Sequence, residues 1–257
     1  MDELISIITP SYNTAPYILQ TIQSVLNQTY TYWEMIIVDD CSTDNTCDVV
    51  NKVSDERIIY IQNERNSGAA ISRNKALAVA KGKWIAFLDS DDLWAPDKLE
   101  KQLEFMKDNK YHFSYTNYSE IGEESESLGV FVTGPKKISK AGMYNYCWPG
   151  CLTVMYDADV VGLVQIADLK KNNDYAIWLQ VIRITNCYLL DKELAKYRRR
   201  TGSISNHGYI KLLKWHYMLY RIGEKRSRII SSILTVKNMI FGFWKKVKYV
   251  HKCGEQK

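Results

Sequence analysis

Acidic residues gather at two places in the first hundred residues, each directly after an apolar run. Asp39 and Asp40 follow residues 35–38, and Asp89 and Asp91 follow residues 84–88. Adjacent carboxylates repel each other, and clustering them without a cation raises their pKa values. Mg²⁺ and Mn²⁺ take oxygen ligands, and Mg²⁺ commonly binds through one or two carboxylates together with substrate phosphates. The clusters therefore predict a divalent cation that is held jointly with a phosphorylated ligand.

The segments that must position these carboxylates alternate between two kinds. Short apolar runs are typical of buried strands, and the stretches between them have the apolar spacing of helices. Such alternation predicts a parallel sheet covered on both faces, with ligands bound at the carboxyl ends of the strands. Polar residues follow each run, so we expect these clusters to share one edge. The predicted strands are 4–8, 35–38, 58–61 and 84–88, the helices are 16–28, 44–53 and 70–80, and the polar clusters are 10–13, 39–42, 62–66 and 89–92.

The polar clusters have the side chains that a nucleotide requires. Tyr12 is suited to stack on a base, and Asp40 to accept hydrogen bonds from a base N–H or from ribose hydroxyls. The sequence contains neither GxGxxG nor GxxxxGK[ST], which disfavours a dinucleotide fold or a P-loop. A metal ion must then neutralise the phosphates. The competing interpretation is that the Asp pairs are only turns or helix caps.

The motifs of this segment resemble those of the family 2 glycosyltransferases. The matching stretches are IITPSYN (7–13), SVLNQTY (24–30), VDDCSTD (38–44), GAAISRNKAL (68–77) and FLDSDD (87–92). The resemblance is dense over residues 4–100 and weaker to about residue 205. It implies a GT-A fold and inverting transfer from a nucleotide sugar, most often a UDP-sugar, with Mn²⁺ or Mg²⁺.

The resemblance also implies roles for single residues. Asp91 matches the metal ligand, and Asp92 is a weaker candidate. Arg73 matches an arginine near the base and the diphosphate. The remaining donor-binding positions are Pro10, Tyr12, Asn13, Asp39 and Asp40 on the nucleoside side, and Asp89 and Ser90 at the ribose or sugar.

Inverting transfer needs a carboxylate that takes the proton of the acceptor hydroxyl. In the family this base lies in an acidic pair before a helix, and Asp174 in the stretch NNDYAIWL falls on its position. Asn173 replaces the preceding acid, which puts the usual support of the base in doubt. The other interpretation of Asp174 is a helix N-cap. Arg198 and Arg200, in the basic stretch 197–205, match residues that neutralise the diphosphate.

The C-terminal segment differs in charge from the rest of the chain. Residues 192–257 contain 17 Lys and Arg but 3 Asp and Glu, whereas the chain as a whole has a net charge of +5. From residue 210 to 250, basic residues interleave with Ile, Phe and Trp, which is typical of a helix lying on an anionic membrane. A helix packed on the catalytic domain is the alternative. We predict a catalytic domain over 1–205, with a donor half (1–110) and an acceptor half (111–205), and a basic helical tail over 206–257.

The composition narrows the setting and the partners. No apolar run reaches the roughly 20 residues that span a bilayer, no signal peptide is evident, and the six cysteines show no CxxC or zinc spacing. We therefore expect a cytoplasmic protein, peripheral on the inner face of the cytoplasmic membrane, whose acceptor is a glycan, such as one linked to polyprenyl diphosphate. The alternatives are a soluble or protein acceptor, or an inactive scaffold that binds nucleotide sugars. No recognition motif supports nucleic acid as a partner.

Overall fold

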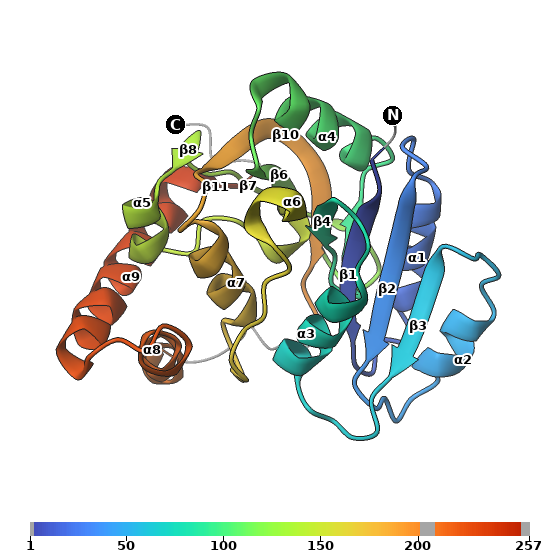
Figure 1. The fold of residues 1–257 in the computed structure, drawn as a ribbon, viewed down its shortest axis with the longest axis horizontal. Coiled ribbons are helices and arrows are strands. Elements are labelled where there is room, and N and C mark those ends of the chain that lie inside the picture. Colours follow the sequence, from blue (N-terminus) through green and yellow to red (C-terminus); the bar gives the residue numbers. More distant parts are fainter. Residues whose placement is uncertain (1–2, 201–208, 253–257) are drawn as a thin grey trace.

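The computed structural model describes residues 3–200 and 209–252, and the strands of these residues form one mixed sheet (Figure 1). The order along the sheet is β11-β7-β6-β9-β4-β1-β2-β3, and β10 lies beside β6 and also pairs with β5 and β8. The strands are β1 (Ile5–Ser11), β2 (Trp33–Asp39), β3 (Ile58–Gln62), β4 (Trp84–Phe87), β5 (Leu93–Trp94), β6 (Phe113–Ile121), β7 (Ser127–Val132), β8 (Lys137–Ile138), β9 (Met155–Asp157), β10 (Cys187–Arg198) and β11 (Val250–Lys252).

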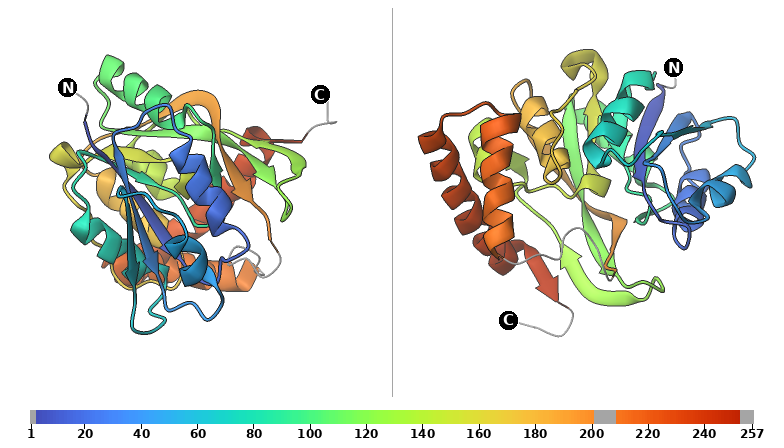
Figure 2. Two further views of the ribbon diagram at one scale, coloured as in Figure 1. Left: turned by 90° about the vertical axis from the view of Figure 1, so that its right-hand side faces the viewer. Right: turned by 90° about the horizontal axis from the view of Figure 1, so that it is seen from below.

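Helices cover both faces of this sheet, and two of them extend the molecule at one end (Figures 1 and 2). They are α1 (Ile18–Leu26), α2 (Thr46–Asn51), α3 (Ala69–Val79), α4 (Lys98–Asn109), α5 (Lys140–Asn145), α6 (Ala158–Val161), α7 (Asn173–Val181), α8 (Tyr209–Met218) and α9 (Arg228–Tyr249), with short turns η1 (Cys151–Thr153) and η2 (Leu219–Gly223).

The first half of the chain forms the parallel part of the sheet, as predicted. β1 lies between β4 and β2, and β3 flanks β2. Side chains alternate between two cores, as the period of a strand requires. Ile5 and Ile7 face the core under α1, α2 and α4, whereas Ile8 faces the core under α3 and α7. The order of the strands reverses at β1, which is where open α/β sheets bind their ligands.

The predicted end of the first strand was wrong by three residues. β1 continues through Pro10 to Ser11, which pair with Val38 and Asp39 of β2. A proline inside a sheet normally leaves a ladder hydrogen bond unmade. Here β4 pairs with β1 only as far as Ile8. No residue of β4 therefore lies beside Pro10, so no hydrogen bond is lost there. Pro10 and Ser11, which belong to the motif at 7–13, are thus part of β1.

The C-terminal segment is tied to the rest of the molecule at two places. α9, which runs side by side with α8 (Figure 2), packs against α5, and β11 pairs with β7 in antiparallel register, His251 opposite Phe131. Among the described helices, none is both long enough and apolar enough to cross a bilayer. The predicted boundary between catalytic domain and tail falls within residues 201–208, outside the described residues.

Candidate functional site

The carboxyl ends of β1, β2 and β3 are joined directly by backbone hydrogen bonds. The N–H of Asp40 donates to the carbonyl of Ser11 at 2.8 Å, and the N–H of Asn63 donates to the carbonyl of Asp39, also at 2.8 Å. The Asp39 carboxylate is fully buried and accepts from the N–H and the hydroxyl of Ser42, at 2.9 and 2.5 Å. The three polar clusters therefore share one edge, as predicted, and Asp39 holds its own turn together.

Tyr12 is the exposed member of this edge. Its side chain is 43% exposed, whereas Pro10 is buried inside β1. Asn13 has a positive φ of 50° and joins two loops. Its amide oxygen accepts from the N–H of Thr43 at 2.8 Å, and its own N–H donates to the Ser42 hydroxyl at 2.8 Å. Tyr12 thus has a free ring face on a fixed loop, while Asn13 fixes that loop.

Asp40 shapes the loop before α3. Its carboxylate accepts from the side chain of Asn63 at 2.9 Å, from the N–H of Ser67 at 2.9 Å and from the N–H of Gly68 at 2.6 Å. Gly68 has a φ of 91°, which a residue with a side chain adopts at a cost. Asp40 is 3% exposed, so its bonds to this loop account for most of its hydrogen-bonding capacity.

Arg73 connects three parts of the site that are far apart in the sequence. It projects from α3 and is 5% exposed. Its guanidinium donates to the carboxylate of Asp89 after β4, to the amide oxygen of Asn173 on α7, and to the Cys151 thiol at 3.5 Å. Burial lowers its pKa, but the carboxylates of Asp89 and Asp174 raise it more, so Arg73 stays a cation. Asn173, whose support role was in doubt, is therefore the residue that links α7 to Arg73.

Asp91 faces a basic residue, and its neighbour faces the interior. The Asp91 carboxylate lies 2.7 Å from the Arg200 guanidinium. Burial raises the pKa of Asp91, Arg200 lowers it, and Asp89 raises it again. Asp92 is fully buried and accepts from the N–H of Arg198 at 2.8 Å, while burial and the two neighbouring carboxylates raise its pKa well above the ordinary value. Ser90 is also buried.

These residues fit a cation that is shared with a substrate. Residues 3–200 and 209–252 contain no group of three or more His, Cys, Asp or Glu side chains arranged to hold a metal by themselves. The turn offers two carboxylates, those of Asp89 and Asp91. Mg²⁺ commonly binds through one or two carboxylates together with substrate phosphate oxygens. A bound cation would also relieve the repulsion that raises the pKa of Asp91.

Arg198 is a hub of hydrogen bonds that the sequence did not reveal. It is 1% exposed, and its guanidinium donates to the carbonyl of Asp91 at 2.8 Å and to the side chain of Gln20 at 2.8 Å. Its remaining acceptors are the carbonyls of Gly122 and Glu123, at 3.2 and 2.8 Å, and the hydroxyl of Ser125, at 2.9 Å. Through these hydrogen bonds Arg198 holds the Asp89–Asp91 turn in place. Arg200 differs from it, because its guanidinium faces the carboxylate of Asp91 in that turn. The rest of the basic stretch, 201–205, lies outside the described residues.

Asp174 lies in the first turn of α7. The N-cap of this helix is Asn172, with φ of 57°, and the Asn172 side chain makes no capping hydrogen bond. The alternative role of Asp174 as the N-cap was therefore wrong. Positive partial charge at the helix N-terminus favours the ionised carboxylate. Burial nevertheless raises the pKa of Asp174, against the opposing effect of Arg73. A carboxylate with a raised pKa is better matched to accepting a proton.

Helix α9 buries polar residues and exposes apolar ones. Ser231, Thr235, Asn238 and Lys245 face the domain, and the Lys245 ammonium donates to the carbonyl of Trp148 at 2.8 Å. The alternative prediction, that the tail helix packs on the catalytic domain, therefore holds for this inner face. The outer face carries a row of exposed side chains at alternating spacings of four and three: Ile229, Ile233, Val236, Ile240, Phe243 and Val247, each between 52% and 74% exposed.

The segment that Lys245 contacts leads back to the site. Trp148 packs edge-on against Phe241, Trp244 and Tyr249 of α9. Three residues further along the chain, Cys151 contacts both Arg73 and Asp89. The inner face of α9 therefore supports the segment 146–151, which reaches Arg73 and Asp89. Cys147 and Cys151 are free cysteines and form no disulfide with each other.

Known proteins share this sequence and fold. Residues 6–137 match the sequence profile described as Glycosyl transferase family 2. TuaG of Bacillus subtilis (strain 168), a glycosyltransferase provisionally named for teichuronic acid biosynthesis, is 44% identical over 86% of this chain and 89% of its own. WfaP of Escherichia coli, named a UDP-Glc:alpha-D-GlcNAc-diphosphoundecaprenol beta-1,3-glucosyltransferase, is 42% identical over 87% of this chain and 88% of its own.

Among solved structures, residues 1–349 of S. aureus TarS in complex with UDP-GlcNAc superpose with a TM-score of 0.69 at 20% identity, covering 96% of this chain and 76% of that one. This likeness confirms the predicted GT-A fold. The profile match, the two relatives and the fold agree, and this chain belongs to glycosyl transferase family 2.

Proposed function

We propose that this glycosyltransferase moves a hexose or N-acetylhexosamine from a UDP-sugar to a lipid-linked glycan, with inversion, at the cytoplasmic face of a membrane. The approach of Asp89 and Asp174 to Arg73, with Asp91 two residues beyond Asp89 and paired with Arg200, is the observation that supports it best. Two acidic turns from different halves of the chain meet on one buried cation. In a single displacement the base acts on the acceptor hydroxyl at one side of the sugar, and the metal acts on the leaving diphosphate at the other side.

Asp174, Arg73, Arg200 and Asp91 have different roles in the proposed reaction. The acceptor hydroxyl transfers its proton to Asp174 while its oxygen forms a bond to the anomeric carbon, and the bond from that carbon to the diphosphate breaks. The electron pair of this bond leaves with the diphosphate. Arg73, which stays a cation, and Arg200 are placed to offset the charge that develops. A Mn²⁺ or Mg²⁺ ion on Asp91 would supply Lewis-acid stabilisation of the same leaving group.

The donor and acceptor are proposed from the relatives and from the site. WfaP is named for UDP-glucose and for a sugar linked to diphosphoundecaprenol. In this chain, Tyr12 offers an exposed ring beside Asp40 for a nucleoside base. The outer face of α9 combines six exposed apolar side chains with Arg228, Lys237, Lys246 and Lys248, which fits the plane of an anionic membrane. A lipid-linked acceptor would be met there.

Calorimetric titration with UDP and GDP, in Mn²⁺ or in EDTA, tests the donor site. We expect UDP to bind only with the metal, and Asp91→Ala to abolish this metal-dependent binding. Asp97→Ala is the matched control, because Asp97 is a nearby acidic residue whose partner is Lys101. Transfer of labelled sugar to a lipid-linked and to a soluble acceptor then separates the two acceptor classes. Binding of no nucleotide under any condition would instead favour the inactive scaffold.

A further inference from the structure

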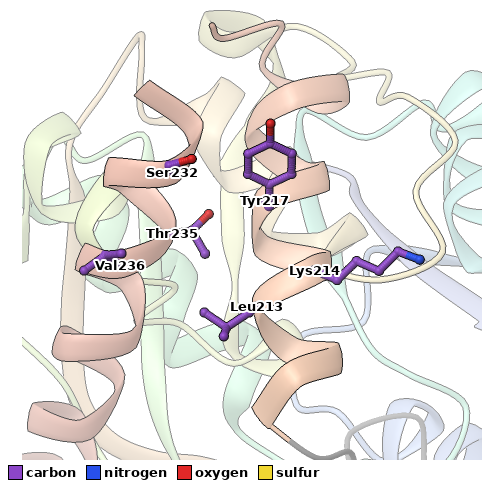
Figure 3. A pocket seen from close by; sticks show the side chains of 6 residues that line it. All are labelled: Leu213, Lys214, Tyr217, Ser232, Thr235 and Val236. Carbon is purple, nitrogen blue, oxygen red and sulfur yellow. The ribbon is translucent and has the colours of Figure 1, made fainter. Parts of the chain in front are cut away.

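A groove lies between α8 and α9, on the side of the molecule away from β3 (Figure 3). Its volume is about 340 Å³. Figure 3 shows side chains from both helices around it, with Leu213 projecting from α8 toward α9. The lining residues are Leu213, Lys214 and Tyr217 of α8, and Ser232, Thr235 and Val236 of α9.

The groove opens onto the apolar outer face of α9. Val236 lines the groove and also belongs to the exposed row that contains Ile233 and Ile240. Leu213, on the opposite wall, is 40% exposed. A hydrocarbon chain that lies against this outer face can therefore enter the groove without crossing a polar barrier. Contiguous exposed apolar surface of this kind marks a binding site in soluble proteins.

The charge around the groove selects the kind of lipid. Residues 209–252 contain 11 Lys and Arg, and their single acid is Glu224. Glu224 is buried and pairs with Arg183 at 2.5 Å and with Arg226 at 3.8 Å, so it is directed away from the cations beside the groove. Lys214 lines the groove from α8 while its ammonium points away from α9 (Figure 3), and Arg228 is exposed one turn before Ser232. An apolar groove with a basic rim is complementary to a long-chain lipid with a phosphorylated head.

The wall of the groove is joined to the helix that carries the proposed base. His216 of α8 is buried, and its ring lies 3.3 Å from the side chain of Asn172 and edge-on to Tyr175. These two residues flank Asp174 on α7. The groove and the proposed base are thus separated by about one helix, a diameter of roughly 10 Å.

We propose that this groove holds the isoprenoid chain of a lipid-diphosphate acceptor, with the basic rim at its diphosphate. The inference rests on the proposed function and names where its acceptor is bound. Chain, diphosphate and sugar of one molecule then lie on the groove, its rim and Asp174 in that order.

Binding of a fluorescent polyprenyl diphosphate to the full chain in detergent micelles tests this site without requiring transfer. Ser232→Trp fills the groove from an exposed position, so the fold is expected to tolerate it, and Ser232→Ala is the matched control. We expect Ser232→Trp to raise the Kd at least about tenfold, the equivalent of roughly two buried methylene groups, and Ser232→Ala to leave it unchanged. Leu213→Ser, which removes apolar wall instead of filling the groove, is expected to weaken binding as well.

Other results would overturn the assignment. Unchanged binding in both groove variants would show that the chain lies elsewhere. Equal competition by a phospholipid of matched chain length would assign the groove to membrane lipid, and a dimer that Ser232→Trp dissociates would assign it to a second copy. Sugar transfer is measured separately with the wild type. Intact binding without transfer to any acceptor contradicts the proposed function, whereas transfer without a groove effect contradicts this inference alone.

Discussion

Replacing Arg198 tests whether this residue stabilises the fold or binds the nucleotide. The guanidinium donates to five acceptors, of which four lie within 2.9 Å, and the residue is buried. Each such hydrogen bond contributes about 1 kcal/mol net, and the acceptors left behind lose their partner in a dry environment. We therefore expect Arg198→Met to lower the free energy of unfolding by about 4 kcal/mol. That is a large fraction of the roughly 5–15 kcal/mol by which domains are stable.

The neighbouring residue provides the control. Arg199 pairs with Glu120 at 2.6 Å, and the Arg199 side chain is 49% exposed whereas that of Glu120 is 10% exposed. Because Arg199 makes this one pair and is half exposed, Arg199→Met should lower the unfolding free energy by about 1–2 kcal/mol, less than Arg198→Met. Urea unfolding of the three proteins, followed by fluorescence, measures the difference. The reasoning is refuted if Arg198→Met unfolds within about 0.5 kcal/mol of wild type while losing nucleotide affinity, because Arg198 would then act on the ligand.

Three further predictions follow from the site and the tail. Asp174→Asn should keep metal-dependent UDP binding and lose transfer by a factor of roughly 10²–10⁴, the usual contribution of a general base; wild-type turnover in a transfer assay would contradict this role. Because burial raises the pKa of Asp174, kcat/KM should fall on the acid side of its pH profile at a pH above the ordinary carboxyl range. Arg73 lowers this pKa, so Arg73→Gln should move the acid side of the profile to higher pH. An acid side that does not move would exclude Asp174 as its source. Ile233→Asp should weaken binding to anionic vesicles at least about tenfold, whereas Ile184→Asp, at a similarly exposed position outside the tail, should not; equal effects in a flotation assay would show that no particular face binds.

The donor half of the fold was predictable because its signals are local. The apolar run at 35–38 lies within β2, the run at 84–88 extends one residue beyond β4, and the predicted helix at 70–80 differs from α3 by one residue at each end. Parallel strands bring their carboxyl ends together, so the shared polar edge also followed. The end of β1 did not, because it depends on how far β4 reaches beside Pro10. That is a property of the sheet and not of the segment.

The links between the two halves were beyond the sequence. Arg73 and Asn173 are 100 residues apart, and Arg198 and Gln20 are 178 residues apart. No local pattern distinguishes a buried arginine that holds a turn from an exposed one that binds phosphate. The motif stretch 197–205 contains both kinds, since Arg198 is enclosed by protein acceptors and Arg200 faces Asp91. Only the three-dimensional partners separate them.

The pairing of β11 with β7 has a consequence for the solubility of shortened proteins. β11 covers an outer strand of the sheet, and the N–H of Thr133 donates to the carbonyl of Tyr249 at 2.9 Å at the point where α9 joins it. An uncovered strand edge presents unpaired backbone groups to other chains and promotes self-association. Removing the residues from α9 onward would expose β7 together with Trp148. The shortened protein is therefore expected to aggregate through this edge, even though a long exposed apolar row has been removed.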